Sequence, residues 1–417
     1  MLSFIYKIIS TIVFILILPF WLILGMFKPK LITGFKQKCG FYNEPLIKKQ
    51  KTIIFYGVSV GEVIAMENLI KKARETFPEL NITLLTGTKT GQEIAQKKLG
   101  ETCDFISYFP FDFPFCINNF IKKIKPSAVF VMETELWPNF ANIMKSKKIP
   151  LYIINGRISD RTYKSYKNLS FFFKPVLRKY TSIFTQSKND NNKLISIGAN
   201  PETTEVMGNL KFDIKKPDVE NLDFTRGVDD KIIIAGSTHS GEDEIILEIF
   251  AQLKKEIPAL KLIIASRHPE RNNDVYGMMD KTGFSCSKRS QKADFSQNDI
   301  ILLDTMGELG NFYSVCDVAF IGGSFNKTGG HNPLEATIFN KPVVSGPSVH
   351  NFKDIYAILT SSDAGKVVKT QEELKEHLKR LLTDENFYQK ASVDCQNVFE
   401  QNKGALSFVM NVLQTLV

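Results

Sequence analysis

The chain has 417 residues, more than one hydrophobic core usually holds, so two domains are expected. Its formal charge of +9 is dispersed, and no RNP-like, zinc-finger or helix-turn-helix signature accompanies it. The charge therefore argues against a nucleic-acid partner and favours an anionic membrane surface or a phosphorylated substrate. The six cysteines occur singly, so neither a disulfide framework nor a zinc site is expected.

The N-terminal segment from Ile8 to Phe27 is twenty residues without a charge, long enough to span a bilayer. No small-x-small cleavage site follows it, so residues 1–30 are predicted to be a retained anchor rather than a signal peptide. By the positive-inside rule, the lysines after it put the rest of the chain in the cytoplasm. Pro19 can kink the helix and leaves an interfacial segment as the alternative. The lysines are Lys28, Lys30, Lys36, Lys38, Lys48, Lys49 and Lys51.

From Lys51 onward, apolar strand patterns alternate with helical ones, which is typical of a doubly wound α/β fold. This alternation of strands and helices is interrupted by a polar, proline-containing linker near residues 215–229 and continues after it. We therefore expect two Rossmann-like domains, 31–216 and 217–417, which face a cleft and carry ligands at the carboxyl ends of their strands. The expected strands are 52–56, 81–86, 128–132, 151–155 and 182–186, then 231–235, 260–265, 300–304, 318–321 and 342–345.

The stretch from Val318 to Ala336 predicts a strand, a glycine-rich turn and a helix start. Asn332 suits the N-cap and Glu335 stands where a capping box would place it, so ordinary capping is one interpretation. The other is a ligand site: Gly329, Gly330 and His331 lie beside a helix start whose free amides would bind a phosphate. Glu335 would then bind a ribose.

The first half offers carboxylates after two strands. Ser59 and Glu62 in GVSVGE have capping-box spacing, but Glu62 is also a candidate general base, with Ser59 and Gly61 on the same turn. Glu133 and Glu135 follow the strand at 128–132, and at most one of them should face the site because they are two residues apart. A carboxylate near Glu62 would oppose the loss of basicity that a helix N-terminus causes.

Two further features of the first half remain open between function and packing. Arg157 ends a strand, where it can pair with a carboxylate or a phosphate. The aromatic loop from Tyr108 to Phe115, followed by a basic helix, predicts either contact with acyl chains and phosphates or an ordinary packed loop.

In the second half, basic, hydroxyl and histidine side chains gather where strands end. Four of the five histidines fall in such loops, which indicates a site rather than scattered core residues. Helical metal-pair spacing, D-x-D, G-x-G-x-x-G and P-loop motifs do not occur, so we expect neither a metal nor a dinucleotide cofactor. The candidates are Ser237, Thr238 and His239, then Arg267, His268 and Arg271.

Seven motifs, GVSVGE, METELWP, NGRIS, GNLKFD, AGSTHSGE, ASRHPER and GGHNPLEA, occur in the order seen in the 3-deoxy-D-manno-octulosonic acid (Kdo) transferases of lipopolysaccharide synthesis, which the chain resembles after its anchor. Gly156 and Ser240 stand where alanine and glutamate are more usual, and neither change removes a base or a phosphate contact.

This resemblance implies an inverting, metal-independent glycosyltransferase of the GT-B fold that uses CMP-Kdo as donor and a tetraacyl disaccharide lipid A precursor as acceptor. It implies that Glu62 is the base and that the METELWP segment lines the acceptor side. A cation must meet the donor carboxylate, for which Arg157, Lys211, Arg267 and Arg271 are the candidates. An inner-membrane location follows, with no cofactor. Another GT-B enzyme, such as a nucleotide-sugar epimerase, and a catalytically dead membrane-bound binding protein are the alternatives.

Overall fold

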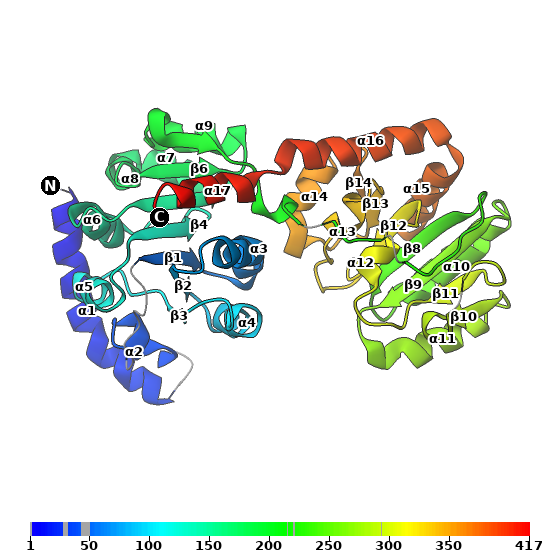
Figure 1. Cartoon of the computed structure of the whole chain (residues 1–417), viewed down its shortest axis with the longest axis horizontal. Coiled ribbons are helices and arrows are strands. Elements are labelled where there is room, and N and C mark those ends of the chain that lie inside the picture. Colours follow the sequence, from blue (N-terminus) through cyan, green and yellow to red (C-terminus); the bar gives the residue numbers. More distant parts are fainter. Residues whose placement is uncertain (1, 28–31, 43–50, 215, 220–221, 293) are drawn as a thin grey trace. The chain divides into compact units, whose positions relative to one another are not determined.

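The computed structural model describes all residues except 1, 28–31, 43–50, 215, 220–221 and 293 (Figure 1). Four lysines of the predicted basic flank, Lys28, Lys30, Lys48 and Lys49, lie outside the described residues. The chain forms two compact units: Met1–Ile214 together with Asn402–Val417, and Lys215–Gln401.

The first unit is a seven-stranded parallel sheet with helices on both faces (Figure 1). Its strands are almost wholly buried, because apolar side chains from both faces pack under helices. In spatial order the strands are β3 (Phe105–Tyr108), β2 (Asn81–Thr86), β1 (Thr52–Gly57), β4 (Ala128–Met132), β5 (Leu151–Gly156), β6 (Ser182–Thr185) and β7 (Thr204–Val206). The main helices are α3 (Val60–Thr76), α4 (Lys89–Leu99), α5 (Pro114–Ile124), α6 (Pro138–Ser146), α7 (Asp160–Asn168), α8 (Ser170–Leu177) and α9 (Lys188–Ile197).

The second unit repeats this architecture with a parallel seven-stranded sheet. In spatial order its strands are β10 (Cys286–Lys288), β11 (Ile300–Leu302), β9 (Leu260–Ser266), β8 (Lys231–Thr238), β12 (Val318–Ile321), β13 (Val343–Ser345) and β14 (Gly365–Val367). The α-helices are α10 (Glu242–Lys254), α11 (Asn272–Asp280), α12 (Leu309–Phe312), α13 (Leu334–Thr337), α14 (Lys353–Leu359), α15 (Gln371–Thr383) and α16 (Glu385–Asn402).

Each sheet reverses its winding at one point, between β1 and β4 in the first unit and between β8 and β12 in the second. Ligands of doubly wound folds bind beyond the carboxyl ends of the strands at such a switch point. In the first unit, the loops there lead to Glu62 and to Glu133. In the second unit, they carry His239 and His331.

The C-terminal helix α17 (Ala405–Gln414) corrects the predicted boundary, which assigned all of 217–417 to the second domain. It belongs to the first unit and contacts α3 (Figure 1). Ala405, Val409 and Leu413 recur every four residues, are fully buried and complete the core under α3. The Asp213 carboxylate fixes the start of the helix, accepting hydrogen bonds from the backbone nitrogens of Gly404 and Leu406, both at 2.7 Å.

The N-terminal helix α1 (Leu2–Phe27) lies against the first unit through one of its faces. Phe14 packs on Phe113 and Trp21 packs on Phe111, with ring centroids 4.3 and 5.0 Å apart. The Asn139 amide donates a hydrogen bond to Ser10 Oγ at 3.0 Å. Among the described residues, no helix meets the length and hydropathy needed for a membrane span.

Candidate active site

Glu62 lies in the first turn of α3 and makes the predicted capping box with Ser59. Its Oε2 accepts a hydrogen bond from the Val58 nitrogen at 2.8 Å, and its Oε1 accepts one from Ser59 Oγ at 2.8 Å. Gly61, between them, is exposed. Both carboxylate oxygens are thus held in place, which orients the Glu62 side chain. Glu62 therefore does cap the helix, as one of the two interpretations expected.

Glu135 shares this region with Glu62 and Glu133. Burial, followed by the charges of Glu62 and Glu133, raises the pKa of the Glu135 carboxyl to about 7, and the Trp137 side chain partly offsets this rise. This coupling shows that the three carboxylates interact electrostatically at one end of the sheet. The pKa of Glu135 is thus strongly perturbed, a feature that clusters at functional sites.

Arg157 follows β5 and is joined to the glutamate loop through Thr134. The Arg157 nitrogen donates to Thr134 Oγ1 at 3.2 Å, and that hydroxyl donates to the Arg157 carbonyl at 2.5 Å. The structure therefore brings Arg157 beside the loop of Glu133 and Glu135. Lys211, predicted to serve the donor, also lies in the first unit, in a short 3-10 helix at Leu210–Phe212.

The aromatic loop before α5 is a packed loop. Phe109 is 6% exposed and stacks on Tyr56 with ring centroids 3.9 Å apart. Phe111 and Phe113 contact Trp21 and Phe14 of α1. The loop therefore packs against the N-terminal helix α1, a contact that the sequence analysis did not predict.

In the second unit, three of the predicted histidines come together. Nε2 of His239 lies 2.9 Å from Nε2 of His331, and the ring of His268 lies 5.2 Å from that of His239. Burial, followed by the charges of His239 and Arg267, lowers the pKa of His331 to about 4. Burial likewise lowers the pKa of His239. The pair is therefore neutral near neutral pH and lies within the field of nearby cations.

Glu242 and Asp243, at the start of α10, were not among the predicted site residues, although Glu242 ends the AGSTHSGE motif and Asp243 directly follows it. Asp243 is fully buried, pairs with the Arg271 guanidinium and accepts a hydrogen bond from Thr238 Oγ1 at 2.5 Å. Ser237 precedes Thr238 with a φ of +56°, which turns the end of β8 away from a regular strand. Glu242 is also buried and contacts the glycine-rich loop. An acidic pair that begins three residues after the strand-end His239 was the available signal.

The glycine-rich loop differs from the expectation of free amides. The Gly330 nitrogen donates to the Gly323 carbonyl at 2.7 Å, and the His331 nitrogen donates to the Gly322 carbonyl at 3.2 Å. The helix that follows, α13, is a single turn. These two amides are therefore occupied and are not free to bind a phosphate. Gly329 has a φ of +98°, and an added Cβ would lie 2.4 Å from His350 Nε2.

Glu335 stands on α13 but makes no capping box. Its Oε1 accepts a hydrogen bond from the Asn332 side-chain amide at 3.2 Å, and Asn332 Oδ1 accepts one from the Leu334 nitrogen at 3.2 Å. Desolvation raises the pKa of the Glu335 carboxyl, partly offset by Asn332, although the residue keeps an exposed face. Its helix has one turn to stabilise, so capping is a weak explanation for it.

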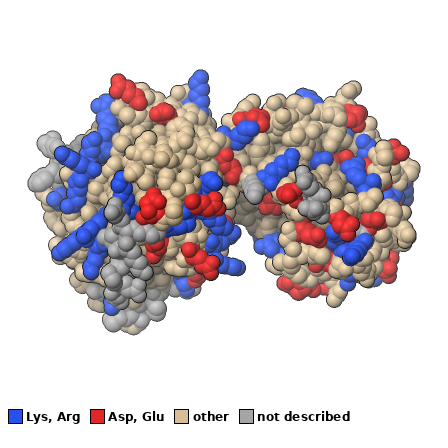
Figure 2. Space-filling view, in the orientation of Figure 1, with Lys and Arg blue, Asp and Glu red and all other residues tan. Residues whose placement is uncertain are grey.

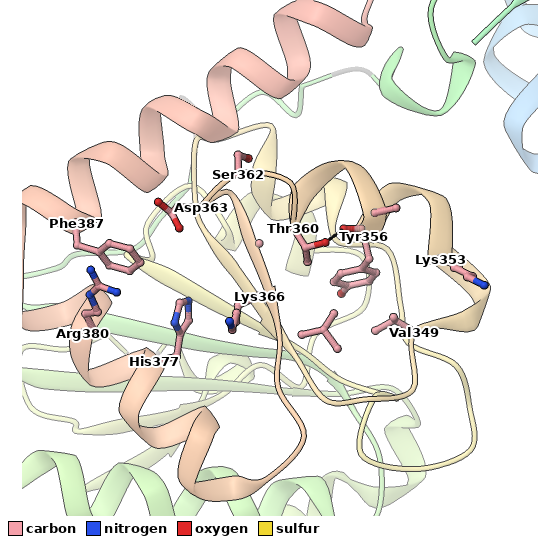
Figure 3. Close-up of a pocket in the computed structure, with 13 residues that line it drawn as sticks. Val349, Lys353, Tyr356, Thr360, Ser362, Asp363, Lys366, His377, Arg380 and Phe387 are labelled. Atoms are coloured by element: carbon pink, nitrogen blue, oxygen red, sulfur yellow. Dashed lines mark hydrogen bonds between the residues drawn. The ribbon is translucent and has the colours of Figure 1, made fainter. Parts of the chain in front are cut away.

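A surface pocket of about 500 Å³ lies elsewhere in the second unit, between α14, β14, α15 and α16 (Figure 3). No predicted donor residue lines it. Arg380 stacks on Phe387 at 3.7 Å, and the Asp363 carboxylate pairs with Lys390 at 2.6 Å. Arg380 and Asp363 therefore already have partners. We assign the candidate active site to the switch-point loops rather than to this pocket. Within the described part of the chain, no group of three or more His, Cys, Asp or Glu side chains is arranged to hold a metal.

Solved structures with this fold support the architecture. The UDP-GlcNAc 2-epimerase from Neisseria meningitidis bound to UDP-GlcNAc has a TM-score of 0.54 and 16% identity, over 88% of this chain and 100% of that chain. The glycotransferase of kitacinnamycin has a TM-score of 0.52 and 10% identity, over 89% and 100%. Together with the two parallel sheets, they show that the chain has the GT-B fold.

The particular family follows from sequence comparison. Residues 33–214 match the family model described as 3-Deoxy-D-manno-octulosonic-acid transferase (kdotransferase), and residues 241–396 match Glycosyl transferases group 1. The 3-deoxy-D-manno-octulosonic acid transferase of Haemophilus influenzae is 34% identical over 96% of this chain and 95% of that protein. The enzyme of the same name from Rickettsia bellii is 31% identical over 80% of each. The chain belongs to the Kdo transferase family.

Proposed function

We propose that this chain transfers Kdo from CMP-Kdo to a hydroxyl of a lipid A precursor, the tetraacyl disaccharide, in lipopolysaccharide synthesis. Family membership makes it a Kdo glycosyltransferase. The residue assignment rests on the loops at the switch point of each sheet. Those of the first unit carry interacting carboxylates, and those of the second carry histidines with arginines.

The reaction needs a base and a stabilised leaving group. The acceptor oxygen forms a bond to the anomeric carbon of Kdo while the bond from that carbon to the phosphate oxygen breaks, and CMP leaves with the electron pair. Glu62 takes the proton of the acceptor hydroxyl. Its orientation by Val58 and Ser59 favours one direction of attack, and it interacts electrostatically with Glu135. Ser59, Gly61, Glu133 and Arg157 complete the acceptor side.

The donor side is assigned to the second unit, with Lys211 of the first unit as a further cation. CMP-Kdo carries a phosphate and a carboxylate, both anionic, and fixed cations and hydrogen-bond donors can stabilise the departing CMP without a metal. Arg267 and the His239–His331 pair supply such groups in one place. Glu335 is assigned to the ribose. The remaining donor residues are Ser237, Thr238, His268, Arg271, Gly329, Gly330 and Asn332.

A CMP-release assay tests this function against its alternatives. Purified full-length chain is mixed with CMP-Kdo, with and without the tetraacyl disaccharide, and CMP and glycolipid are measured. Acceptor-dependent CMP release with a product heavier by Kdo supports the proposal. Conversion of UDP-GlcNAc in a parallel reaction would support an epimerase, and donor binding without product would indicate a binding protein.

For the membrane, we propose that α1 attaches the chain to the cytoplasmic face of the inner membrane by lying in the interface. Its outward face exposes large apolar side chains, including Leu16 at 72% and Phe20 at 64%. Lys7 and Lys36 are exposed on or near the helix, and Figure 2 shows lysine and arginine spread over the visible face of the first unit. Apolar insertion combined with basic side chains favours anionic lipid surfaces.

Vesicle binding tests this attachment. Changing both Leu16 and Phe20 to lysine should reduce co-sedimentation with vesicles of phosphatidylglycerol and phosphatidylethanolamine while leaving the melting curve unchanged. Val228 and Met306, 99% and 80% exposed on the second unit, provide a matched control with the same charge change. Equal binding by both double variants would refute an interfacial α1.

A further inference from the structure

Glu242 has an unusual set of partners for a carboxylate that is 1% exposed. Its Oε1 accepts hydrogen bonds from the backbone nitrogens of Ser324 and Phe325, at 2.8 and 2.9 Å. Its Oε2 accepts hydrogen bonds from the nitrogens of Gly323 and His239, at 2.7 and 2.9 Å. Both oxygens of one side chain are therefore satisfied by four backbone donors from two separate loops.

The two loops are those on either side of the switch point of the second sheet. Residues 323–325 follow β12 after Gly322, and His239 directly follows β8. A buried carboxylate left without these donors would carry a large desolvation cost, so the contacts hold the loops in one arrangement. That arrangement includes the 2.9 Å contact between His239 and His331.

The contacts also remove amides from ligand binding. Consecutive backbone N–H groups after a strand are a common cradle for phosphate. Here the amides of Gly323, Ser324 and Phe325 already bind an anion that belongs to the chain itself.

We propose that Glu242 is a positioning residue for the donor, and this rests on the proposed function. It acts as an internal anion that fixes residues 323–325 and His239, so that His331 is presented to the donor and the donor phosphate is read by side chains instead of by these amides. Glu242 itself touches neither the donor nor the reacting atoms.

The test uses the full-length chain with Glu242→Gln, which keeps the size but replaces one acceptor oxygen by a donor. We expect amide exchange of a peptide covering residues 322–331 to accelerate about tenfold or more, since buried N–H groups lose their acceptors. The KM for CMP-Kdo should rise about tenfold or more, with a smaller change in kcat. A general loss of fold would instead accelerate exchange throughout the unit.

Glu244→Gln is the matched control, because Glu244 lies in the same helical turn, is exposed and accepts a hydrogen bond from the Gly241 nitrogen at 3.1 Å. It should alter neither the loop exchange nor the KM. If Glu242→Gln does not fold, Glu242→Asp serves instead: it keeps the charge but is one methylene too short to reach all four donors, and it should show the same local pattern.

Unchanged loop exchange in a folded variant would overturn the proposal, as would faster loop exchange with an unchanged KM. Failure of the wild-type chain to use CMP-Kdo would instead refute the proposed function. In that case, slower amide exchange of residues 322–331 on addition of CMP alone to the wild-type chain would show that a nucleotide binds near this loop.

Discussion

Nε2 of His239 lies 2.9 Å from Nε2 of His331, so one nitrogen must donate and the other accept. The two rings therefore take opposite tautomers at this bond, and a second proton there would place two donors face to face. This contact joins the loops after β8 and β12, the two strands at which the sheet reverses.

The first prediction concerns His331 and pH. An unfolded histidine titrates near 6.5, whereas the pKa of His331 is lowered to about 4, so the unfolded state binds the proton first as the pH falls. Stability is therefore lost between about pH 6.5 and 4. His331→Gln should show a smaller drop in melting temperature from about pH 7 to pH 5 than wild type.

His377 provides the comparison for that experiment, because burial, followed by the charges of Lys366 and Arg380, lowers its pKa to about 4 as well. It lies in the separate pocket of Figure 3. His377→Gln should also flatten the pH dependence but leave affinity for CMP-Kdo unchanged, whereas His331→Gln should weaken it. An unaltered pH dependence in His331→Gln would contradict the first prediction.

The second prediction separates ligand binding from helix capping at Glu335. Glu335→Ala should weaken CMP-Kdo binding and leave the melting curve nearly unchanged, because even a full N-cap is worth only about 1 kcal/mol and Glu335 contacts the Asn332 side chain rather than a backbone amide. Nucleotide affinity and thermal unfolding are measured together. A lower melting temperature at unchanged affinity would favour a structural role.

The third prediction is that Glu62→Gln loses about 10² to 10⁴ in turnover, the usual worth of a general base, while CMP-Kdo still binds. Glutamine keeps one acceptor for the Val58 or Ser59 donors, so most of the capping should survive. Ser59→Ala removes a capping hydrogen bond and one of the contacts that orient Glu62 but leaves the carboxylate in place, so it should lose less turnover than Glu62→Gln. Turnover above about a tenth of wild type, well outside that range, would move the base to Glu135.

The fourth prediction concerns Glu135, whose pKa is raised to about 7 by burial and then by Glu62 and Glu133. Between the unfolded value near 4.3 and 7, the folded state holds the proton more tightly, so stability falls as pH rises through this window. Glu135→Gln should therefore melt at a higher temperature than wild type at about pH 8, with little difference at about pH 4. A lower melting temperature for Glu135→Gln at high pH would contradict the coupling.

The fifth prediction concerns α17. Leu413→Ala should destabilise the first unit by about 2–5 kcal/mol, because it opens a cavity in a core that spans α3 and α17. Amide exchange should rise in the first unit and not in the second. Gln414 is exposed, so Gln414→Ala is the matched control. Faster amide exchange confined to the second unit would contradict the assignment of α17 to the first unit.

Sequence periodicity predicted the central strands well and the edges poorly. The strands at 81–86, 128–132 and 318–321 begin and end as expected, since long apolar runs mark strands buried on both faces. The four unpredicted strands, β3, β7, β10 and β14, are the outermost in their sheets. Each has three or four residues and only one neighbouring strand, so its apolar signal is short.

The candidate site shows the same division between local and distant information. Residue types after each strand made Glu62, Glu135, His239 and His331 candidates, because strand ends meet at one edge of a parallel sheet. The acceptor of the loop amides was missed, since Glu242 is 81 residues from Gly323 in the sequence and only the folded chain brings them together.

The position of α17 makes the second unit an insertion within the first. During synthesis, the 214 residues that precede the second unit leave the ribosome long before the helix that completes their core. The apolar side chains of α3 against which Ala405, Val409 and Leu413 later pack are then left without this cover. Maturation of the first unit therefore waits for the second to be made, and a chain released early would expose those side chains to chaperones and proteases.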